Sequence, residues 1–163
     1  IASCLVGSEM CIRDSNMMNR RAQELMANGT HFMNPHGLHD DNHYTTAYDL
    51  YLIFNECIKH EDFVNIIQSE AYTAYYTDVD GNSQEALFTP TNLYAQGEVD
   101  VPENVTIVGG KTGTTDEAGY CLILMEKDSS DNPYISIVMG ASEKPVLYED
   151  MTSLIEAIPS GQQ

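Results

Sequence analysis

Hydrophobic positions recur along this chain with two different periods, and each period predicts a different kind of element. A spacing of about 3.6 residues predicts helices over 16–28, 46–58 and 61–69. A last helix is predicted near the C-terminus, where apolar residues form a stripe at helical spacing. The stripe consists of Tyr148, Met151, Leu154, Ile155 and Ile158.

Short alternating or continuously apolar segments predict strands. Segments 71–78 and 84–89 flank the turn sequence Asp80-Gly81-Asn82, and this arrangement predicts a hairpin. Three more strands are predicted further along the chain at hairpin distance from one another. The first begins at Val105, and the other two span 120–126 and 134–139.

Polar residues and glycine mark the ends of two predicted helices. Ser15 or Asn16 is suited to cap the first helix, and Gly29 is suited to end it. Thr46 and Asp49 have the spacing of a capping box at the start of the second helix.

The segment 120–126 is apolar on both of its faces. Leu122 and Leu124 alternate there with Cys121, Ile123 and Met125. A strand buried on both faces needs cover from both sides. Helices on each face of an antiparallel sheet would supply that cover, so the expected class is α/β, of the α+β type.

Composition narrows the class of protein. Of 163 residues, 42% are hydrophobic, as in a globular domain, and the formal net charge is −18. So negative a surface repels phosphate backbones and anionic lipids, so nucleic acid is not an expected partner. No apolar run is long enough for a transmembrane segment.

The sequence Lys111-Thr112-Gly113 ends the β-branched segment that starts at Val105. A cation, a hydroxyl and a residue without a side chain there can hold a peptide carboxylate at a sheet edge and polarise a nucleophile. Three residues are a weak signal by themselves, since an ordinary strand end with a solvated lysine can have the same sequence. The surrounding sequence makes the signal stronger.

Further segments match one family in the family's own order. They are Met18 to Leu25, Thr30 to Leu38, His43 to Leu50 and Asp116 to Tyr120, and with the Lys-Thr-Gly box they extend over most of the chain. The chain thus resembles the serine-type D-alanyl-D-alanine carboxypeptidases, which are penicillin-binding proteins of the β-lactamase/transpeptidase-like family. The resemblance implies an antiparallel sheet with helices on both faces.

The resemblance also implies an activity. These enzymes remove the terminal D-alanine from peptidoglycan stem peptides through an acyl-enzyme, need no cofactor or metal, and are inhibited by β-lactam antibiotics. The expected partner is therefore a stem peptide ending in D-Ala-D-Ala. The expected location is outside the cytoplasm, at the periplasmic or extracellular face of the membrane.

The resemblance assigns roles to several residues. Lys111 would keep the site electropositive, Thr112 would bind the substrate carboxylate, and Gly113 would let the peptide approach the strand edge. The N–H of Thr114 would be an oxyanion donor, and His36 would shape the wall of the cleft. The family commonly places an arginine where this chain has Leu147, and Lys144 is the nearest cation.

Two motifs of the family are missing. A Ser-x-x-Lys motif would need serine three residues before a lysine, but Glu56, Val108, Leu124 and Ala141 occupy those places. The sequence Ser130-Asp131-Asn132 spells Ser-x-Asn but follows the box, and its polar neighbours predict a turn. The chain is therefore expected to be the C-terminal part of a catalytic domain, N-terminally truncated, incomplete and inactive.

The N-terminal segment 1–15 does not fit the family and resembles translated adapter or linker sequence. The expected organisation is this non-native segment, the catalytic part over 16–158 and a tail over 159–163. Cys4 and Cys11 fall in the first segment. Cys57 and Cys121 lie in apolar segments and are expected to be buried free thiols.

Three other interpretations are open. A catalytically dead module could bind peptidoglycan peptides, and a class A β-lactamase-like hydrolase would share the box. The histidine-rich loop offers nitrogen and oxygen atoms to a zinc ion, although no pair of ligands four residues apart sits on a clear helix and no metal is expected. Its candidate ligands are His31, His36, His39, Asp40, Asp41 and His43.

Overall fold

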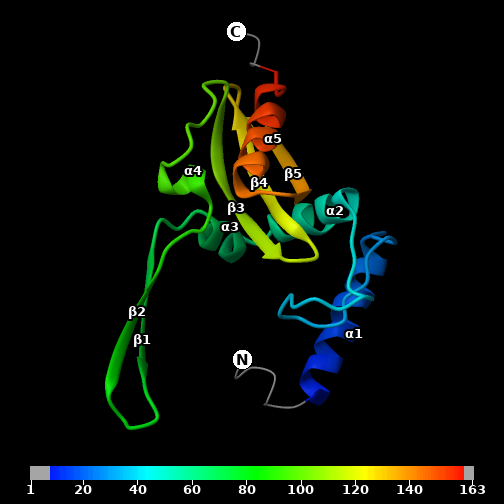
Figure 1. Ribbon diagram of the computed structural model, residues 1–163, viewed down its shortest axis with the longest axis vertical. Coiled ribbons are helices and arrows are strands. Elements are labelled where there is room, and N and C mark those ends of the chain that lie inside the picture. Colours follow the sequence, from blue (N-terminus) through cyan, green and yellow to red (C-terminus); the bar gives the residue numbers. More distant parts are fainter. Residues whose placement is uncertain (1–7, 160–163) are drawn as a thin grey trace.

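The structure is a computed structural model that describes residues 8–159. Helices and strands follow one another in mixed order along the chain (Figure 1). The helices are α1 (Ser8–Glu24), α2 (Ala47–Cys57), α3 (Glu61–Ile67), α4 (Leu93–Gln96) and α5 (Lys144–Glu156). The strands are β1 (Tyr72–Thr77), β2 (Ser83–Phe88), β3 (Val105–Thr115), β4 (Gly119–Asp128) and β5 (Pro133–Ala141).

The strands form two antiparallel sheets. The larger has three strands in the order β3-β4-β5, so β4 is central. Its register is continuous except for irregularities at Ile107/Gly109 and at Tyr120/Leu122. The smaller sheet is the predicted hairpin of β1 and β2, which extends away from the larger sheet as an arm (Figure 1).

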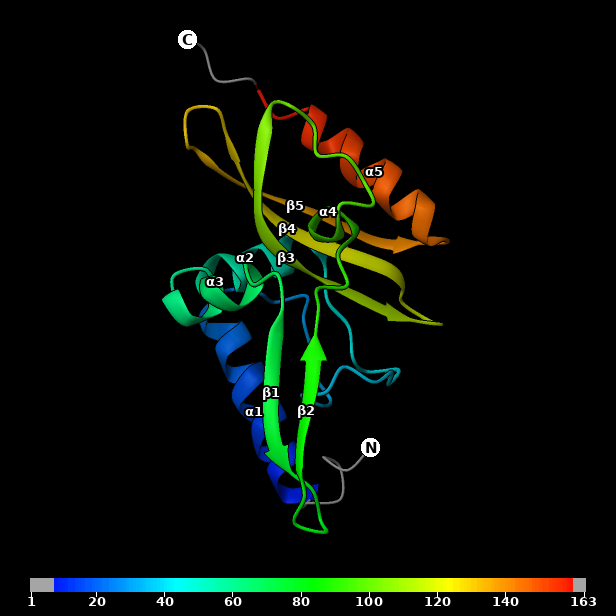
Figure 2. The same ribbon diagram turned by 90° about the vertical axis from the view of Figure 1, so that its left-hand side faces the viewer.

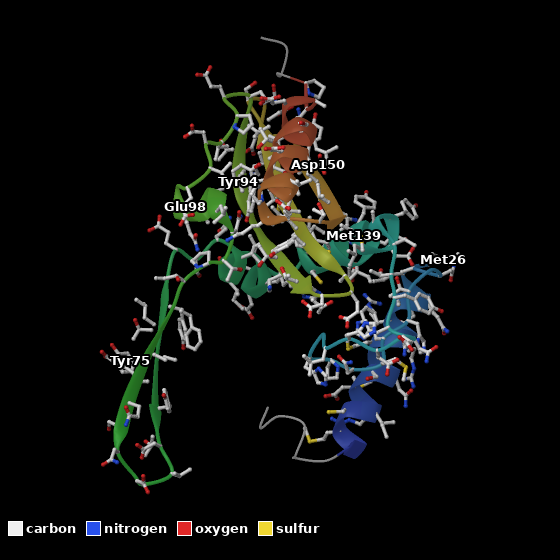
Figure 3. The ribbon with its side chains drawn as sticks, in the orientation of Figure 1. Met26, Tyr75, Tyr94, Glu98, Met139 and Asp150 are labelled. Carbon is white, nitrogen blue, oxygen red and sulfur yellow. The ribbon has the colours of Figure 1, made fainter. Side chains whose placement is uncertain are left out.

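Helices cover both faces of the larger sheet. Figure 2 shows α5 on one face, and α2 and α3 on the other. Helix α5 contacts β4 and β5, while α2 contacts β5 and α3 contacts β3. This three-layer arrangement confirms the expected class, an antiparallel sheet between helices.

The main core lies between β4 and α5. Leu122 and Leu124 are 2% and 0% exposed, and they pack in one cluster with residues of α5. Burying side chains of this size stabilises a fold by about 1.5–3 kcal/mol each. The cluster from α5 is Leu147, Tyr148, Met151 and Ile155, with Ile158 just beyond the helix. Leu154, predicted on the same stripe, is instead 44% exposed.

Helix α1 differs from its predicted bounds. It spans Ser8–Glu24, so Ser15 lies within the helix, where its hydroxyl donates to the carbonyl of Cys11 rather than capping an end. The helix ends before Gly29 because Met26 adopts a left-handed conformation with φ 63°. The N–H of Ala27 then donates to Ala22, as in a Schellman cap.

The predicted cap at Thr46 and the predicted turn at 130–132 are confirmed. Thr46 caps α2, its side chain accepting from the N–H of Asp49. Ser130 and Asn132 lie in the turn between β4 and β5, where their N–H groups donate to one Asp128 oxygen at 2.8 and 2.9 Å. The segment Ser130–Asn132 is therefore a turn.

The two cysteines predicted to be buried are only partly buried. Cys57 and Cys121 are free thiols, as predicted, but both are half-buried rather than enclosed. Burial raises the pKa of the Cys57 thiol. The predicted non-native segment overlaps the start of α1, and its residues 1–7 lie outside the described part of the chain.

A carboxyl group is enclosed in the core. Glu126 follows Leu122 and Leu124 on the buried face of β4 and is 0% exposed. Neither of its side-chain oxygens has a hydrogen-bond partner among the described residues. Burial raises the pKa of Glu126 to about 7, and the nearby Ser136 offsets only part of that rise.

The enclosed carboxyl predicts that stability falls with increasing pH. The unfolded chain ionises Glu126 near its ordinary pKa of 4.5, whereas the folded chain holds the proton until about pH 7. Glu126 therefore imposes no penalty on the folded state below pH 4.5. As the pH rises from 4.5 to about 7, the free energy of unfolding falls by about 3 kcal/mol. In urea unfolding, Glu126→Gln should gain about this much relative to wild type between pH 4.5 and pH 8.

Glu85→Gln is the matched control, because it removes one carboxylate from the exposed β1–β2 hairpin. Both substitutions make the net charge of −18 less negative by one. Subtracting the stability change of Glu85→Gln from that of Glu126→Gln therefore leaves the part that is due to burial. If the two variants showed the same pH dependence relative to wild type, the Glu126 carboxyl would be solvated and its assignment to the core would be wrong.

Candidate active site

The Lys-Thr-Gly box lies in the second half of β3, at the edge of the larger sheet. Strand β3 pairs only with β4, so its other edge is open within the described residues. A segment of backbone with free N–H and C=O groups is a site where an extended peptide can add as a further strand. The fold therefore places the box where a peptide could lie beside it.

The strand register divides the box between the two faces of the sheet. Thr112 pairs with Leu122, which lies under α5, so Thr112 is on the α5 face. Lys111 pairs with Ile123, so it is on the opposite face, the one covered by α2 and α3. Successive residues of a strand alternate in this way. One open edge thus presents a cation on one face and a hydroxyl on the other.

Two glycines of β3 allow different approaches. A Cβ on Gly109 would lie 2.4 Å from the carbonyl oxygen of Ile67, because α3 packs directly on the strand there. A Cβ on Gly113 would have no atom within 4 Å. Gly109 therefore lets a helix approach, while Gly113 leaves the space beside the box open.

Lys111 is exposed, and its ammonium group donates to the carbonyl of Thr112. It forms no ion pair with an acidic residue in the described part of the chain, although the protein has 25 acidic residues. Thr114 is also exposed, three residues further along the strand. The charge of Lys111 is thus available to a ligand.

The histidine-rich loop between α1 and α2 reaches the end of β3. His39 Nδ1 lies 3.9 Å from a carboxylate oxygen of Glu117, in the turn between β3 and β4. Its Nε2 lies 3.3 Å from Asp41. His36 is exposed in this loop, and its Nδ1 accepts from the N–H of Leu38 at 3.2 Å. The loop carrying His36 therefore lies beside the strand that carries the box.

Hydrogen bonds fix the base of this loop. The Asn19 side chain of α1 donates to the Phe32 carbonyl at 2.8 Å and accepts from the Phe32 N–H at 2.7 Å. His43 Nδ1 accepts from the N–H of Met33, which fits a neutral ring. Burial lowers the pKa of His43, with Asp40 offsetting part of the effect.

The histidines do not converge on a metal site. Within the described residues, no group of three or more histidine, cysteine, aspartate or glutamate side chains is arranged to hold a metal ion. The loop is instead held by backbone pairing between His31 and Tyr44 and by the contacts of Asn19.

Lys144 is not part of the Lys-Thr-Gly box and lies at the start of α5. It is exposed and lines an open groove of about 600 Å³ together with Leu93 and Tyr148. Leu147, which stands where the resemblance expects an arginine, is 2% exposed within the core. The leucine that stands here in place of the family's arginine therefore serves the core, because this position faces the sheet.

One contact of the box was not predicted from the sequence. The hydroxyl of Thr91, in the loop between β2 and α4, lies 2.5 Å from the hydroxyl of Thr112. The two residues are 21 positions apart, and Thr91 stands in an ordinary polar loop sequence without a motif. No pattern in the sequence could have paired them.

Comparison with known proteins identifies the family. The sequence profile described as D-alanyl-D-alanine carboxypeptidase matches residues 2–143, which includes the segment predicted to be non-native. The D-alanyl-D-alanine carboxypeptidase DacF of Bacillus subtilis is 30% identical over 139 residues, covering 85% of this chain and 33% of the relative. DacA of Haemophilus influenzae is 30% identical over 123 residues, covering 76% and 28%.

The fold agrees with this match. The crystal structure of the Streptomyces K15 DD-transpeptidase superposes with a TM-score of 0.74 at 26% identity, covering 85% of this chain and 51% of that protein. The chain belongs to the D-alanyl-D-alanine carboxypeptidase family. It spans about a third of the length of DacF and about half of the Streptomyces enzyme.

The two glycines predict opposite responses to one substitution. Gly109→Ala should destabilise the fold by about 3 kcal/mol, at the upper end for overpacking, because backbone of α3 must move away from the strand. Gly113→Ala, on the same strand, should change stability by less than about 0.5 kcal/mol. Urea unfolding of both variants measures the difference. Equal stability of the two would show that α3 does not pack on β3.

Proposed function

We propose that this chain carries the strand-edge half of the active site of a serine-type D-Ala-D-Ala carboxypeptidase. The observation that supports this most directly is the Lys-Thr-Gly box on the open edge of β3, inside the family match. The substrate would be a peptidoglycan stem peptide ending in D-Ala-D-Ala, lying as an added strand along β3.

The proposed roles follow from position along β3. Lys111, unpaired by any described carboxylate, supplies positive potential on the α2/α3 face. Thr112 offers its hydroxyl to the terminal carboxylate of the peptide, and the open space at Gly113 lets the peptide approach. The N–H of Thr114 donates to the oxyanion that forms when the scissile carbonyl is attacked.

Two further residues have supporting roles. His36 would form part of the cleft wall, since its loop lies beside the β3–β4 turn through His39 and Glu117. Lys144 would contribute a diffuse positive charge from the start of α5. As a point charge it cannot grip a carboxylate with the paired hydrogen bonds that arginine makes.

The chain would not complete the reaction by itself. Acyl transfer in this family needs a serine to form the acyl-enzyme, and no serine in this sequence stands in a Ser-x-x-Lys motif. The alternative function of a binding module for peptidoglycan peptides is favoured by that same observation. In both cases β-lactams would be ligands of the whole protein, and the site of action would be outside the cytoplasm. Among the described residues, no helix combines the length and hydrophobicity that a bilayer crossing requires.

The missing nucleophile predicts that this chain forms no covalent adduct with a fluorescent penicillin. The measurement is the intact mass after incubation, with a complete penicillin-binding enzyme as the positive control. Because acylation adds the whole antibiotic to the protein, a single adduct is readily detected. A stoichiometric mass increase would reveal a nucleophile elsewhere in the chain and would contradict the proposed role.

In a domain whose upstream half is restored, we expect Lys111 to promote acylation. When the corresponding N-terminal half of the Streptomyces K15 enzyme is joined to this chain, Lys111→Ala should slow penicillin acylation by about 10²-fold or more. An exposed lysine at a strand edge contributes little to the core, so the fold should survive. Lys59→Ala, an exposed lysine after α2, is the control. Unchanged acylation in Lys111→Ala would remove Lys111 from the site.

A further inference from the structure

The contact between Thr91 and Thr112 joins the box to a separate segment of the chain. Their hydroxyl oxygens are 2.5 Å apart, and either can be the donor. Thr91 is exposed and Thr112 is half-buried, so the pair lies at the surface of the α5 face. It is therefore accessible to a ligand lying along β3.

The segment that carries Thr91 is held on both sides. Before it, the carbonyl of Pro90 accepts from the Gln96 side chain at 2.6 Å. After it, the buried Asn92 accepts from the N–H of Tyr94 at 3.1 Å. The N–H of Leu93 donates to the hydroxyl of Tyr148 on α5 at 2.9 Å. The position of the Thr91 hydroxyl is thus set by α4 and by the core helix α5.

A hydroxyl has one proton to donate and two lone pairs to accept with. If Thr91 donates to Thr112, the proton of Thr112 is directed to a third group, and each hydrogen bond polarises the next. A carboxylate is the natural acceptor at the end of such a chain, since it only accepts. Hydrogen bonds to an ionised acceptor are also the stronger kind.

We propose that Thr91 is a positioning residue that fixes the hydroxyl of Thr112 for the free carboxylate of a bound peptide. This proposal rests on the proposed function, because it assumes that Thr112 binds that carboxylate. The arginine expected by the resemblance is replaced by the core residue Leu147, and Lys144 lies at the start of α5. A pair of neutral hydroxyls with a fixed direction supplies selectivity for the carboxylate in its place.

The first part of the test needs no ligand. Three-bond NMR couplings to the Thr112 methyl group report whether its side chain holds one χ1 rotamer. The wild-type chain and Thr91→Ser should show a single rotamer, because both keep a hydroxyl at position 91. Thr91→Val, which has nearly the same shape without the hydroxyl, should show averaging. Thr106→Val, on the exposed part of β3, is the matched control and should leave Thr112 unchanged.

The second part measures selectivity with two peptides, N-acetyl-D-Ala-D-Ala and the same peptide ending in a carboxamide. NMR titration of the wild-type chain should show tighter binding of the carboxylate form. Thr91→Val should weaken binding of the carboxylate form about tenfold and leave the carboxamide unchanged, while Thr91→Ser restores wild-type selectivity. A residue that only supported the fold would weaken both peptides equally.

The outcomes separate the two ideas. A Thr112 rotamer that is indifferent to Thr91→Val overturns the positioning role, whatever the peptides do. Equal weakening of both peptides overturns it as well. A rotamer fixed by Thr91 in a chain that binds neither peptide supports the positioning contact and counts against the proposed function alone.

Discussion

The packing of β4 against α5 is the interaction on which the rest of the structure depends. Every second residue from Leu122 to Asp128 is buried, and the apolar part of that face lies under Leu147 and Met151. Strand β3 is fixed through its hydrogen bonds to β4, so the position of the Lys-Thr-Gly box follows from this core. Helix α5 also holds the start of α4, because the hydroxyl of Tyr148 accepts from the N–H of Leu93.

One buried residue beside that core, Glu126, destabilises the fold when its carboxyl group ionises. The enclosed Glu126 has no hydrogen-bond partner among the described residues, and burial raises its pKa to about 7. An apolar residue of similar size would pack there without a pH-dependent penalty. No contact in the structure explains why a carboxyl stands at this position. The protein therefore combines a well-packed apolar layer with one buried carboxyl group that resists ionisation.

The site contrasts with the rest of the surface. The chain carries a net charge of −18, which by itself would repel a peptide carboxylate. Lys111 and Lys144 are local exceptions, and the hydroxyls of Thr91 and Thr112 add donors without charge. Screening by salt limits the repulsion to about 8–10 Å under physiological conditions, so these nearby groups dominate at the strand edge. In the proposed function, short-range donors rather than the overall field would therefore set what can bind here.

The sequence by itself determined the box and most of the elements, but not the short helix α4. The apolar run in 120–126, the polar turn at 130–132 and the stripe on α5 are local patterns, which the order of apolar and polar residues reports directly. The ends of α1 were less predictable, since the left-handed Met26 ended the helix before the glycine. Only the tertiary structure decided that Thr91 meets Thr112, that Leu147 faces the core and that Leu154 does not. Such contacts depend on register and on packing between segments far apart in the chain, which no local pattern records.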